Sequence, residues 1–381
     1  MIVDLIGFGI VVPVLPFLAK QLGASATVLG FLVASYSAAQ FLVAPAWGRL
    51  SDRIGRRPVM MMTIAGTALS LLGFGLARSL VWLFAARLLG GAFAANIGVA
   101  SAYIADVTGE EERTRWMGLL GASFGVGFVV GPAIGGALAP LGYHVPMLAA
   151  AALAGANWLQ AAVALREPPH HVRIAEAPAP SRVDALRDPL VRRLCFAWLA
   201  FSLAVTQLET IFAYFMMDRF GYDAHQVAFI LVGMAVVMGG IQGGGMRALA
   251  SRFRERALVV AGSVVLAGAF LIVPAVHSLA LLVAVLTVAA ASRAIVQPPL
   301  MSMASLAATS ATRGTVMGTF QSSGSLARAF GPMLAGALYQ RALPLPFVLG
   351  SALLLAVALL GRGLPQRSVA GGSAAAAPAG G

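Results

Sequence analysis

The chain alternates between long apolar runs and short polar connections along almost its whole length. A helical run of about 20 apolar residues crosses the roughly 30 Å hydrocarbon core of a bilayer. Twelve such runs can be counted, and we predict a membrane-spanning helix in each: residues 2–20, 27–48, 58–76, 80–104, 114–139, 145–165, 190–216, 225–249, 257–275, 278–303, 313–339 and 344–362. The pattern therefore predicts an all-α polytopic membrane protein.

Charged residues are scarce and lie mainly in the connections between these runs. The chain is 59% hydrophobic and only 10% charged, whereas a soluble domain contains about 25% charged residues. The formal net charge is +12, but the arginines are spread over many short loops and form no single patch for nucleic acid. We therefore expect the partners to be the lipid bilayer and a small-molecule substrate, and not nucleic acid.

Metal, redox and nucleotide chemistry lack their usual motifs in this sequence. Cys195 is the only cysteine, which rules out an internal disulfide and any CxxC site. The five histidines show no metal-ligand spacing, and no Walker phosphate loop occurs. We therefore expect no enzymatic activity, no metal and no cofactor.

The distribution of basic residues predicts how the chain is oriented in the membrane. If the first helix starts in the cytoplasm, nineteen of the 26 basic residues fall in cytoplasmic loops or in the tail. Only Lys20, Arg78, Arg219 and Arg341 fall in outer loops. Short arginine-rich loops stay in the cytoplasm. We therefore predict that both termini are cytoplasmic.

A long polar connection and an internal repeat divide the chain into two halves. Residues 167–188 are proline-rich and longer than the other connections, which predicts a cytoplasmic linker. When the sequence is shifted by 200 residues, Gly131-Pro132 superposes on Gly331-Pro332. We predict a monomer with six-helix bundles over residues 1–166 and 189–364 and a disordered tail over 365–381.

Five charged side chains are predicted to lie within the spans. The acids are Asp4 and Glu209, and the bases are Arg87, Arg293 and Arg328. A carboxylate at the bilayer centre costs roughly 2.5–3.5 kcal/mol on insertion scales, so burial favours its protonated form. Asp4 is then either a proton-exchange group or an interfacial acid near the start of the chain. Glu209 is either an ion-pair partner of Arg293 or Arg328, or a second site for a proton or substrate.

Polar side chains are also scattered through the spans. Singly, each is more often a helix–helix hydrogen bond than a ligand contact. Together they permit a cavity with mixed polar and apolar walls. The candidate cavity residues are Gln40, Asn96, Gln207, Arg293, Gln297 and Gln321.

The loop between the second and third predicted spans has the highest charge density in the chain. Residues 48–58 hold four arginines and one aspartate. Taken alone, the loop is a positive-inside anchor with a tight turn and a helix cap. It also matches the pattern G-x-L-x-D-R-x-G-R-R at Gly48, Leu50, Asp52, Arg53, Gly55, Arg56 and Arg57. This pattern resembles the signature loop of the major facilitator superfamily, which implies a charge cluster that holds the cytoplasmic side closed and releases it in alternation.

A glycine-rich pattern lies in the predicted fifth span. The pattern G-x-x-x-G-P-x-x-G-G is found at Gly127, Gly131, Pro132, Gly135 and Gly136. Small residues at this spacing allow close helix packing. The pattern also resembles the antiporter motif of drug exporters, and the first span resembles that of the twelve-helix drug/proton antiporters. The resemblance implies that Asp4 faces a central cavity. It also implies that Arg87 matches a buried arginine linked to proton transfer and is the electrostatic counterpart of Asp4.

These features together predict a proton-coupled secondary transporter. By resemblance to tetracycline-type exporters, the chain would lie in the inner membrane of a bacterium and export small amphipathic drugs by alternating access of two bundles. Tetracycline exporters carry an acid in the third span, where Ser70 stands here, which weighs against tetracycline itself as the substrate. Two alternatives stay open: proton-coupled uptake or exchange of an anionic metabolite, and a non-transporting membrane sensor or partner.

Overall fold

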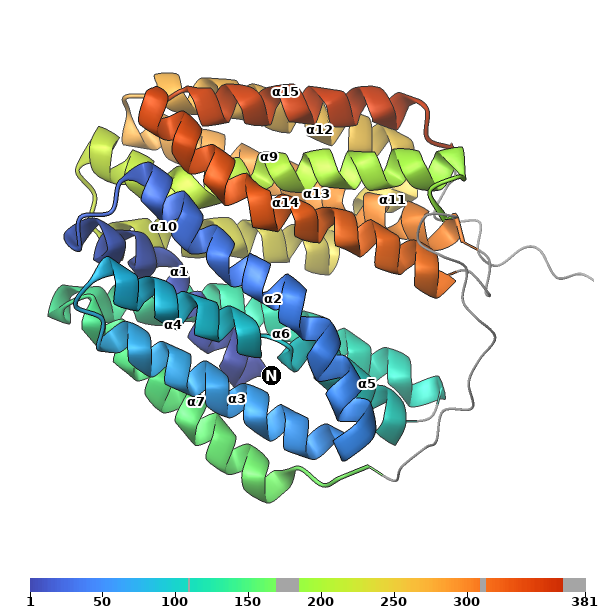
Figure 1. The fold of residues 1–381 in the computed structure, drawn as a ribbon. Coiled ribbons are helices and arrows are strands. Elements are labelled where there is room, and N and C mark those ends of the chain that lie inside the picture. The colour runs from blue at the N-terminus through green and yellow to red at the C-terminus, as the bar shows by residue number, and fades with distance from the viewer. Residues whose placement is uncertain (109, 169–184, 309–312, 366–381) are drawn as a thin grey trace, which may run out of the picture. The chain divides into compact units, whose positions relative to one another are not determined.

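The computed structural model describes residues 1–108, 110–168, 185–308 and 313–365, and every regular element in these ranges is helical (Figure 1). The first elements are α1 (Ile2–Gln21), α2 (Ala26–Ile54), α3 (Arg56–Gly75), α4 (Leu80–Phe93), α5 (Asn96–Val107), α6 (Glu110–Leu138), η1 (Ala139–Leu141) and α7 (His144–Ala164). The later elements are α9 (Pro189–Phe220), α10 (Ala224–Gly240), η2 (Ile241–Gly245), α11 (Met246–Arg252), α12 (Glu255–Ile272), η3 (Val273–Ala275), α13 (Leu279–Leu306), α14 (Arg313–Arg341) and α15 (Leu345–Arg362). The predicted all-α class is confirmed. Most of the predicted linker and of the predicted tail lies outside the described residues.

Eleven helical segments among the described residues are long and apolar enough to cross a membrane. They correspond to eleven of the twelve predicted spans. The remaining prediction, residues 313–339, corresponds to α14, which is more polar than the others but is 29 residues long. That length exceeds the roughly 20 residues that a crossing needs.

The predicted fourth span is broken, whereas the sequence predicted a single helix there. α4 and α5 are separated by Ala94 and Ala95, which form a turn. The indole N–H of Trp47 donates to the Ala92 oxygen at 2.6 Å, and the amide of Gln40 donates to the Ala94 oxygen at 2.8 Å. These bonds satisfy carbonyl groups near the break, as the hydrocarbon region requires. The break therefore depends on side chains of α2, and not on a glycine or proline within it.

The chain separates into two compact units. Unit 1 comprises Met1–Ala175, Glu209–Ala235 and Ala329–Leu343, and unit 2 comprises Glu176–Leu208, Val236–Arg328 and Pro344–Gly381. Within unit 1, α1 packs against α6 and α7, α2 against α4, and α3 against α4 and α7. Within unit 2, α12 packs against both α13 and α15 (Figure 1). Unit 1 thus contains the first helices together with the C-terminal parts of α9 and α14 and most of α10. The predicted division of the chain at the linker stays a prediction.

Helices at corresponding places in the predicted 200-residue repeat have equal lengths. α6 and α14 are both 29 residues long, and each contains an internal proline, at Pro132 and Pro332. α2 has 29 residues, as does the stretch from Ala224 to Arg252. That stretch includes the five-residue π-helix η2 in a glycine-rich segment, whereas α2 is α-helical throughout. The two copies therefore match in length and differ in local geometry.

The Trp47 bond at the break in span four can be tested by a conservative substitution. Trp47→Phe keeps an aromatic ring beside Phe93, 5.3 Å away between ring centroids, but removes the N–H that bonds the Ala92 oxygen. An unpaired buried carbonyl costs about 1–3 kcal/mol, so the thermal unfolding temperature in detergent should fall. The matched control is Trp116→Phe, because Trp116 is exposed. Equal losses in both variants would contradict this explanation.

Candidate functional site

Asp4 lies near the start of α1, and its side chain is enclosed against α7. Its side chain is only 8% exposed, and the amide of Asn157 in α7 donates to Oδ1 at 2.9 Å. Oδ2 lies 3.5 Å from the amino group of Met1 and is buried without a hydrogen bond among the described residues. The resemblance implied that Asp4 faces a central cavity and has Arg87 as its electrostatic counterpart. The structure places Asn157 beside Asp4, and no Asp4–Arg87 ion pair occurs in the described part of the chain. The cavity-facing role of Asp4 stays a prediction.

Arg87 lies in an aromatic cluster built from α1, α2, α4 and α6. Its buried guanidinium stacks over the Tyr36 ring at 4.6 Å, and its Nε has no hydrogen-bond partner among the described residues. The Phe8 ring lies 5.9 Å from Tyr36 and 6.2 Å from Phe128, between centroids. A ring face attracts a cation and partly replaces lost hydration. The cluster therefore presents aromatic surface beside a buried positive charge.

Two predicted cavity residues lie at the break in span four. Gln40 bonds the Ala94 carbonyl, so its amide is used within the fold. Asn96 opens α5, and its Oδ1 is buried without a hydrogen bond among the described residues. An unsatisfied amide oxygen beside a broken helix is a ready acceptor for a ligand or a water molecule. Asn96 is therefore a better candidate contact than Gln40.

The other predicted cavity residues lie farther along the chain. Gln207 is fully buried in α9 and donates to the Leu203 oxygen at 3.2 Å. Arg293 and Gln297 are partly buried one turn apart on α13, whereas Gln321 on α14 is exposed. Glu209 lies in the middle of α9 with an exposed side chain. The first four belong to unit 2 and Glu209 to unit 1, so their joint role remains a prediction.

The charged loop forms a compact cluster around Arg56. Its guanidinium contacts Asp52 at 2.6 Å and Asp106 of α5 at 2.8 Å, and it donates to the Ser51 hydroxyl at 2.6 Å. Gly55 separates α2 from α3 with φ 103°, a conformation that a side chain rarely adopts. The motif thereby joins the ends of α2, α3 and α5. Gly48 is partly buried, and the side chains of Arg53 and Arg57 are exposed.

Glu167, which sequence reasoning missed, completes this cluster. Its two carboxylate oxygens accept hydrogen bonds from the backbone N–H groups of Arg56, at 2.6 Å, and Arg57, at 2.9 Å. A carboxylate at a helix start satisfies free N–H groups and complements the helix dipole. A Cβ on Gly55 would lie 2.6 Å from Glu167 Oε1. The only sequence signal was an acid directly after the sixth span, at the start of the predicted linker.

The second half carries a weaker copy of the loop in which the central charge is reversed. Ser251 stands at the place of Asp52 and Arg254 at that of Gly55, which places Glu255 where Arg56 stands in the first copy. Glu255 is buried, and the Ser302 hydroxyl donates to its Oε1 at 2.7 Å. Oε2 is buried and has no hydrogen bond within the described ranges. The two copies therefore use different chemistry at equivalent helix starts.

The glycine-rich pattern of α6 forms the surface on which α1 packs. A Cβ on Gly127 would lie 2.6 Å from Leu5 Cβ, and a Cβ on Gly135 would lie 2.6 Å from the Ile10 oxygen. A Cβ on Gly131 would overlap Gly9. Gly136 turns to another neighbour, since its oxygen lies 2.9 Å from His225 Nδ1 of α10. Close helix packing, which the spacing predicted, is thus present at this pattern, and its role as an antiporter motif stays a prediction.

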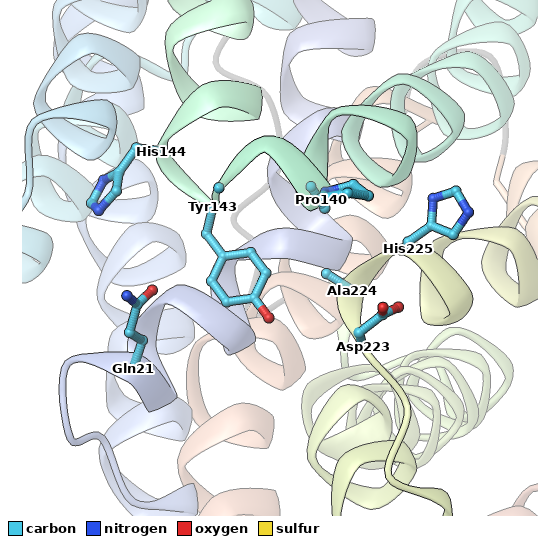
Figure 2. Close-up of a pocket in the computed structure, with 9 residues that line it drawn as sticks. Gln21, Pro140, Tyr143, His144, Asp223, Ala224 and His225 are labelled. Atoms are coloured by element: carbon cyan, nitrogen blue, oxygen red, sulfur yellow. The ribbon is translucent and has the colours of Figure 1, made fainter.

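A pocket of about 370 Å³ lies at one end of unit 1 (Figure 2). We call this the outer end, following the orientation predicted from the arginines. Its lining includes Gln21, Tyr143, His144, Asp223 and His225. Burial raises the pKa of the Tyr143 phenol, and the Asp223 carboxylate raises it further. Tyr143 is therefore a neutral hydrogen-bond donor at pH 7, and its hydroxyl points towards the start of α10 (Figure 2).

Comparison with known proteins identifies the family. The sequence profile described as Major Facilitator Superfamily matches residues 1–248 and 246–377, nearly the whole chain. The chain belongs to the Major Facilitator Superfamily. It is therefore a membrane transporter and not an enzyme, and it acts on a small-molecule substrate.

Relatives within the Major Facilitator Superfamily cover nearly all of the chain. The tetracycline resistance protein, class D, of Salmonella ordonez is 33% identical over 375 residues, and the alignment covers 94% of both proteins. The human organic anion transporter MFSD10 (TETRAN) has a TM-score of 0.70 and 27% identity, with 94% of this chain and 96% of that chain covered. An inward-facing bacterial homolog of the human lysosomal transporter Spinster has a TM-score of 0.82 at 16% identity, with 95% and 93% covered. The predicted twelve-helix transporter fold and the resemblance to tetracycline-type exporters are confirmed.

The packing of α1 on α6 predicts a strong effect of side-chain size at Gly131. Gly131→Leu places a side chain against the backbone of Gly9, and overpacking of this kind costs about 1–3 kcal/mol or more. We expect a lower unfolding temperature in detergent and a loss of transport. Gly125→Leu is the matched control on the same helix, since a Cβ there meets nothing within 4 Å. Similar destabilisation by both substitutions would show that the contact with α1 is not the cause.

The Glu167 contact predicts a graded response to substitution. Glu167→Ala removes both acceptors from the start of α3, and loss of a helix cap costs about 0.5–2 kcal/mol. Glu167→Gln keeps one carbonyl acceptor, so its unfolding temperature should lie between those of the alanine variant and the unaltered protein. Thermal unfolding in detergent measures this order. An unchanged stability in Glu167→Ala would exclude the capping role.

Proposed function

We propose that this transporter exports small amphipathic compounds from a bacterium in exchange for inward-moving protons. The proposal extends to a monomer in the inner membrane with both termini in the cytoplasm and two six-helix halves. The class D relative is named for tetracycline resistance, and a relative in Bacillus subtilis (strain 168), 32% identical over 235 residues, is named multidrug resistance protein 1. These names support export of a drug-like compound.

The observation that carries proton coupling is the environment of Asp4. Its carboxyl group is almost fully enclosed within a membrane-spanning helix, with Asn157 as its only side-chain hydrogen-bond partner in the described chain. A buried carboxylate is costly, and protonation removes that charge. Asn157 donates to Oδ1, and the amino group of Met1 lies 3.5 Å from Oδ2. Burial therefore favours the neutral form, while these two neighbours favour the charged form. Asp4 can therefore alternate between two charge states at modest energetic cost.

Alternating access would couple this protonation to substrate movement. A proton that reaches Asp4 from outside changes the charge of the segment shared by α1, α6 and α7. If the inward-open and outward-open conformations stabilise the protonated and charged forms of Asp4 to different extents, protonation shifts the equilibrium between these conformations. No ion pair joins Arg87 to Asp4 among the described residues, so Arg87 would act on the substrate or on the electric field across the site. It would not act as the direct partner of the proton carrier.

The aromatic cluster around Arg87 supports an aromatic or amphipathic substrate. Phe8, Tyr36 and Phe128 offer ring faces, and Arg87 offers a positive charge to hydroxyl or carboxylate oxygens. Ser70 replaces an acid of the tetracycline exporters, and its hydroxyl donates to the Ala86 oxygen at 2.8 Å. That side chain is used in helix contact. A tetracycline–metal chelate, which is cationic, therefore has less to bind here than a neutral or anionic compound.

A second candidate is transport of an organic anion. MFSD10, at 27% identity, is described as an organic anion transporter. In this chain the buried Arg87 has no carboxylate partner among the described residues, so an anionic group would complete its pairing. Uptake of an anionic and of a cationic fluorescent compound into everted vesicles discriminates the two candidates. If the substrate is an organic anion, an Arg87→Lys variant should lose transport of the anionic compound more than transport of the cationic one.

Asp4→Asn tests the proposed coupling. The variant keeps the size and hydrogen-bonding capacity of the side chain but cannot take up a proton. We expect proton-driven uptake into everted vesicles to fall more than tenfold, because the driving gradient no longer acts on the carrier. Substrate exchange without a gradient should persist.

The matched control for this test is Asp188→Asn. Asp188 is an exposed acid whose Oδ1 accepts the Leu190 N–H at the start of α9 at 2.7 Å, and asparagine caps helices equally well. This variant should transport normally. Gradient-driven transport that survives Asp4→Asn, or transport that is unaffected when the pH gradient is collapsed, would refute proton coupling through Asp4.

A further inference from the structure

A polar cluster joins three helices at the outer end of unit 1. Lys20 at the end of α1 forms an ion pair with Asp218 of α9, with 2.7 Å between Nζ and Oδ1. The Tyr339 hydroxyl of α14 donates to the other oxygen, Oδ2, at 3.0 Å. Asp218 thus uses both carboxylate oxygens to hold segments from opposite ends of the sequence.

Tyr214 extends this cluster to the turn between α1 and α2. Lys20 Nζ lies 5.3 Å from the centre of the Tyr214 ring, and the Tyr214 hydroxyl donates to the Ala24 oxygen at 2.9 Å. Tyr214 and Asp218 are four residues apart and therefore share one face of α9. The cluster Lys20, Tyr214, Asp218 and Tyr339 is called the outer seal below.

Next to the outer seal, α2 and α14 approach so closely that no side chain fits between them. A Cβ on Gly336 would lie 3.0 Å from the carbonyl carbon of Ala26 and 3.1 Å from Cα of Thr27. A Cβ on Gly30 would lie 3.0 Å from the carbonyl carbon of Pro332 and 3.2 Å from Cα of Met333. Backbone contacts of this kind leave no room for a substrate between α2 and α14 at these two points.

We propose that Asp218 is the residue that positions the outer seal, and that substrate leaves only after Lys20 and Tyr339 release it. The inference rests on the proposed alternating access, in which the outer end must open once in each cycle. Lys20 lies in the predicted first half, and Tyr214, Asp218 and Tyr339 lie in the predicted second half. All of them belong to unit 1 in the structure.

The chemistry of the outer seal suits a contact that opens repeatedly. The side chains of Lys20 and Asp218 are 43% and 41% exposed, so water can replace their bonds when they separate. An isolated exposed ion pair contributes little, but a network sharing one carboxylate contributes more. The closed form is therefore favoured without being trapped. The glycine contacts exclude substrate, and the polar cluster sets how often they separate.

Reporter labelling measures this opening directly. Ala24 is only 6% exposed, so Ala24→Cys in a Cys195→Ala background provides a single thiol that reacts when the outer end opens. We expect a membrane-impermeant maleimide, added to right-side-out vesicles, to label this thiol roughly five- to thirty-fold faster in Asp218→Asn and Lys20→Met. Tyr339→Phe, which changes one oxygen atom, should give a smaller increase.

A charge exchange provides the decisive comparison. Lys20→Asp combined with Asp218→Lys restores an ion pair of reversed polarity and should bring labelling back towards the starting rate. Arg78→Gln is the matched control, because Arg78 is an exposed charge at the same end outside the outer seal. Unchanged labelling in Asp218→Asn and Lys20→Met would overturn the proposal. So would a double variant as fast as the single variants, or an equal increase in Arg78→Gln.

Failure of this proposal can be told from failure of the proposed function. The labelling rate needs neither substrate nor a proton gradient, so it reports the seal even if Asp4 carries no proton. Labelling from the opposite side, in everted vesicles only, would instead refute the predicted orientation. Size-exclusion profiles of Tyr339→Phe, the mildest variant, verify that the fold is intact where labelling has changed.

Discussion

Every polar group inside the membrane must find its partner within the protein, and this constraint explains most of the specific contacts of this transporter. Gln40 and Trp47 bond carbonyl groups at the break in span four. Asn157 bonds the carboxyl of Asp4, and the Tyr36 ring covers the charge of Arg87. Where the pairing is incomplete, as at Asp4 and Asn96, the unsatisfied atom is a natural point for a proton or a ligand to act.

Hydropathy made the spans predictable, because a helix in lipid needs apolar length whatever it packs against. The loop motif was predictable for a related reason, since its charges are excluded from lipid and Gly55 requires an unusual backbone conformation. The break at Ala94 and Ala95 was not, since two alanines favour helix and the carbonyl groups near the turn are bonded by side chains that come from α2. The role of Glu167 depends on the packing of the end of α7 beside α3, and a local sequence pattern does not predict such packing. The Asn157–Asp4 hydrogen bond likewise follows from packing of α1 on α7.

The same sequence pattern serves different purposes in the two halves. In the first, Arg56 organises its loop through acids on three other segments. At the equivalent place in the second, a buried Glu255 bonds only a serine hydroxyl within the described chain. Repeats that began alike can thus diverge in charge while keeping helix length. One helix junction is held by ion pairs to Asp52 and Asp106, whose side chains are partly exposed, and the other by a buried hydrogen bond.

The outer seal contains the only lysine of the chain, all other basic residues being arginines. Arginine does not react readily with acylating reagents, so a reagent selective for side-chain amines has a single target on this protein. That target sits between Asp218 and the ring of Tyr214. Acylation would remove the charge from one position without any change to the gene. Apart from the amino group of Met1, a covalent inhibitor or a spectroscopic probe aimed at primary amines would therefore react at this one side chain.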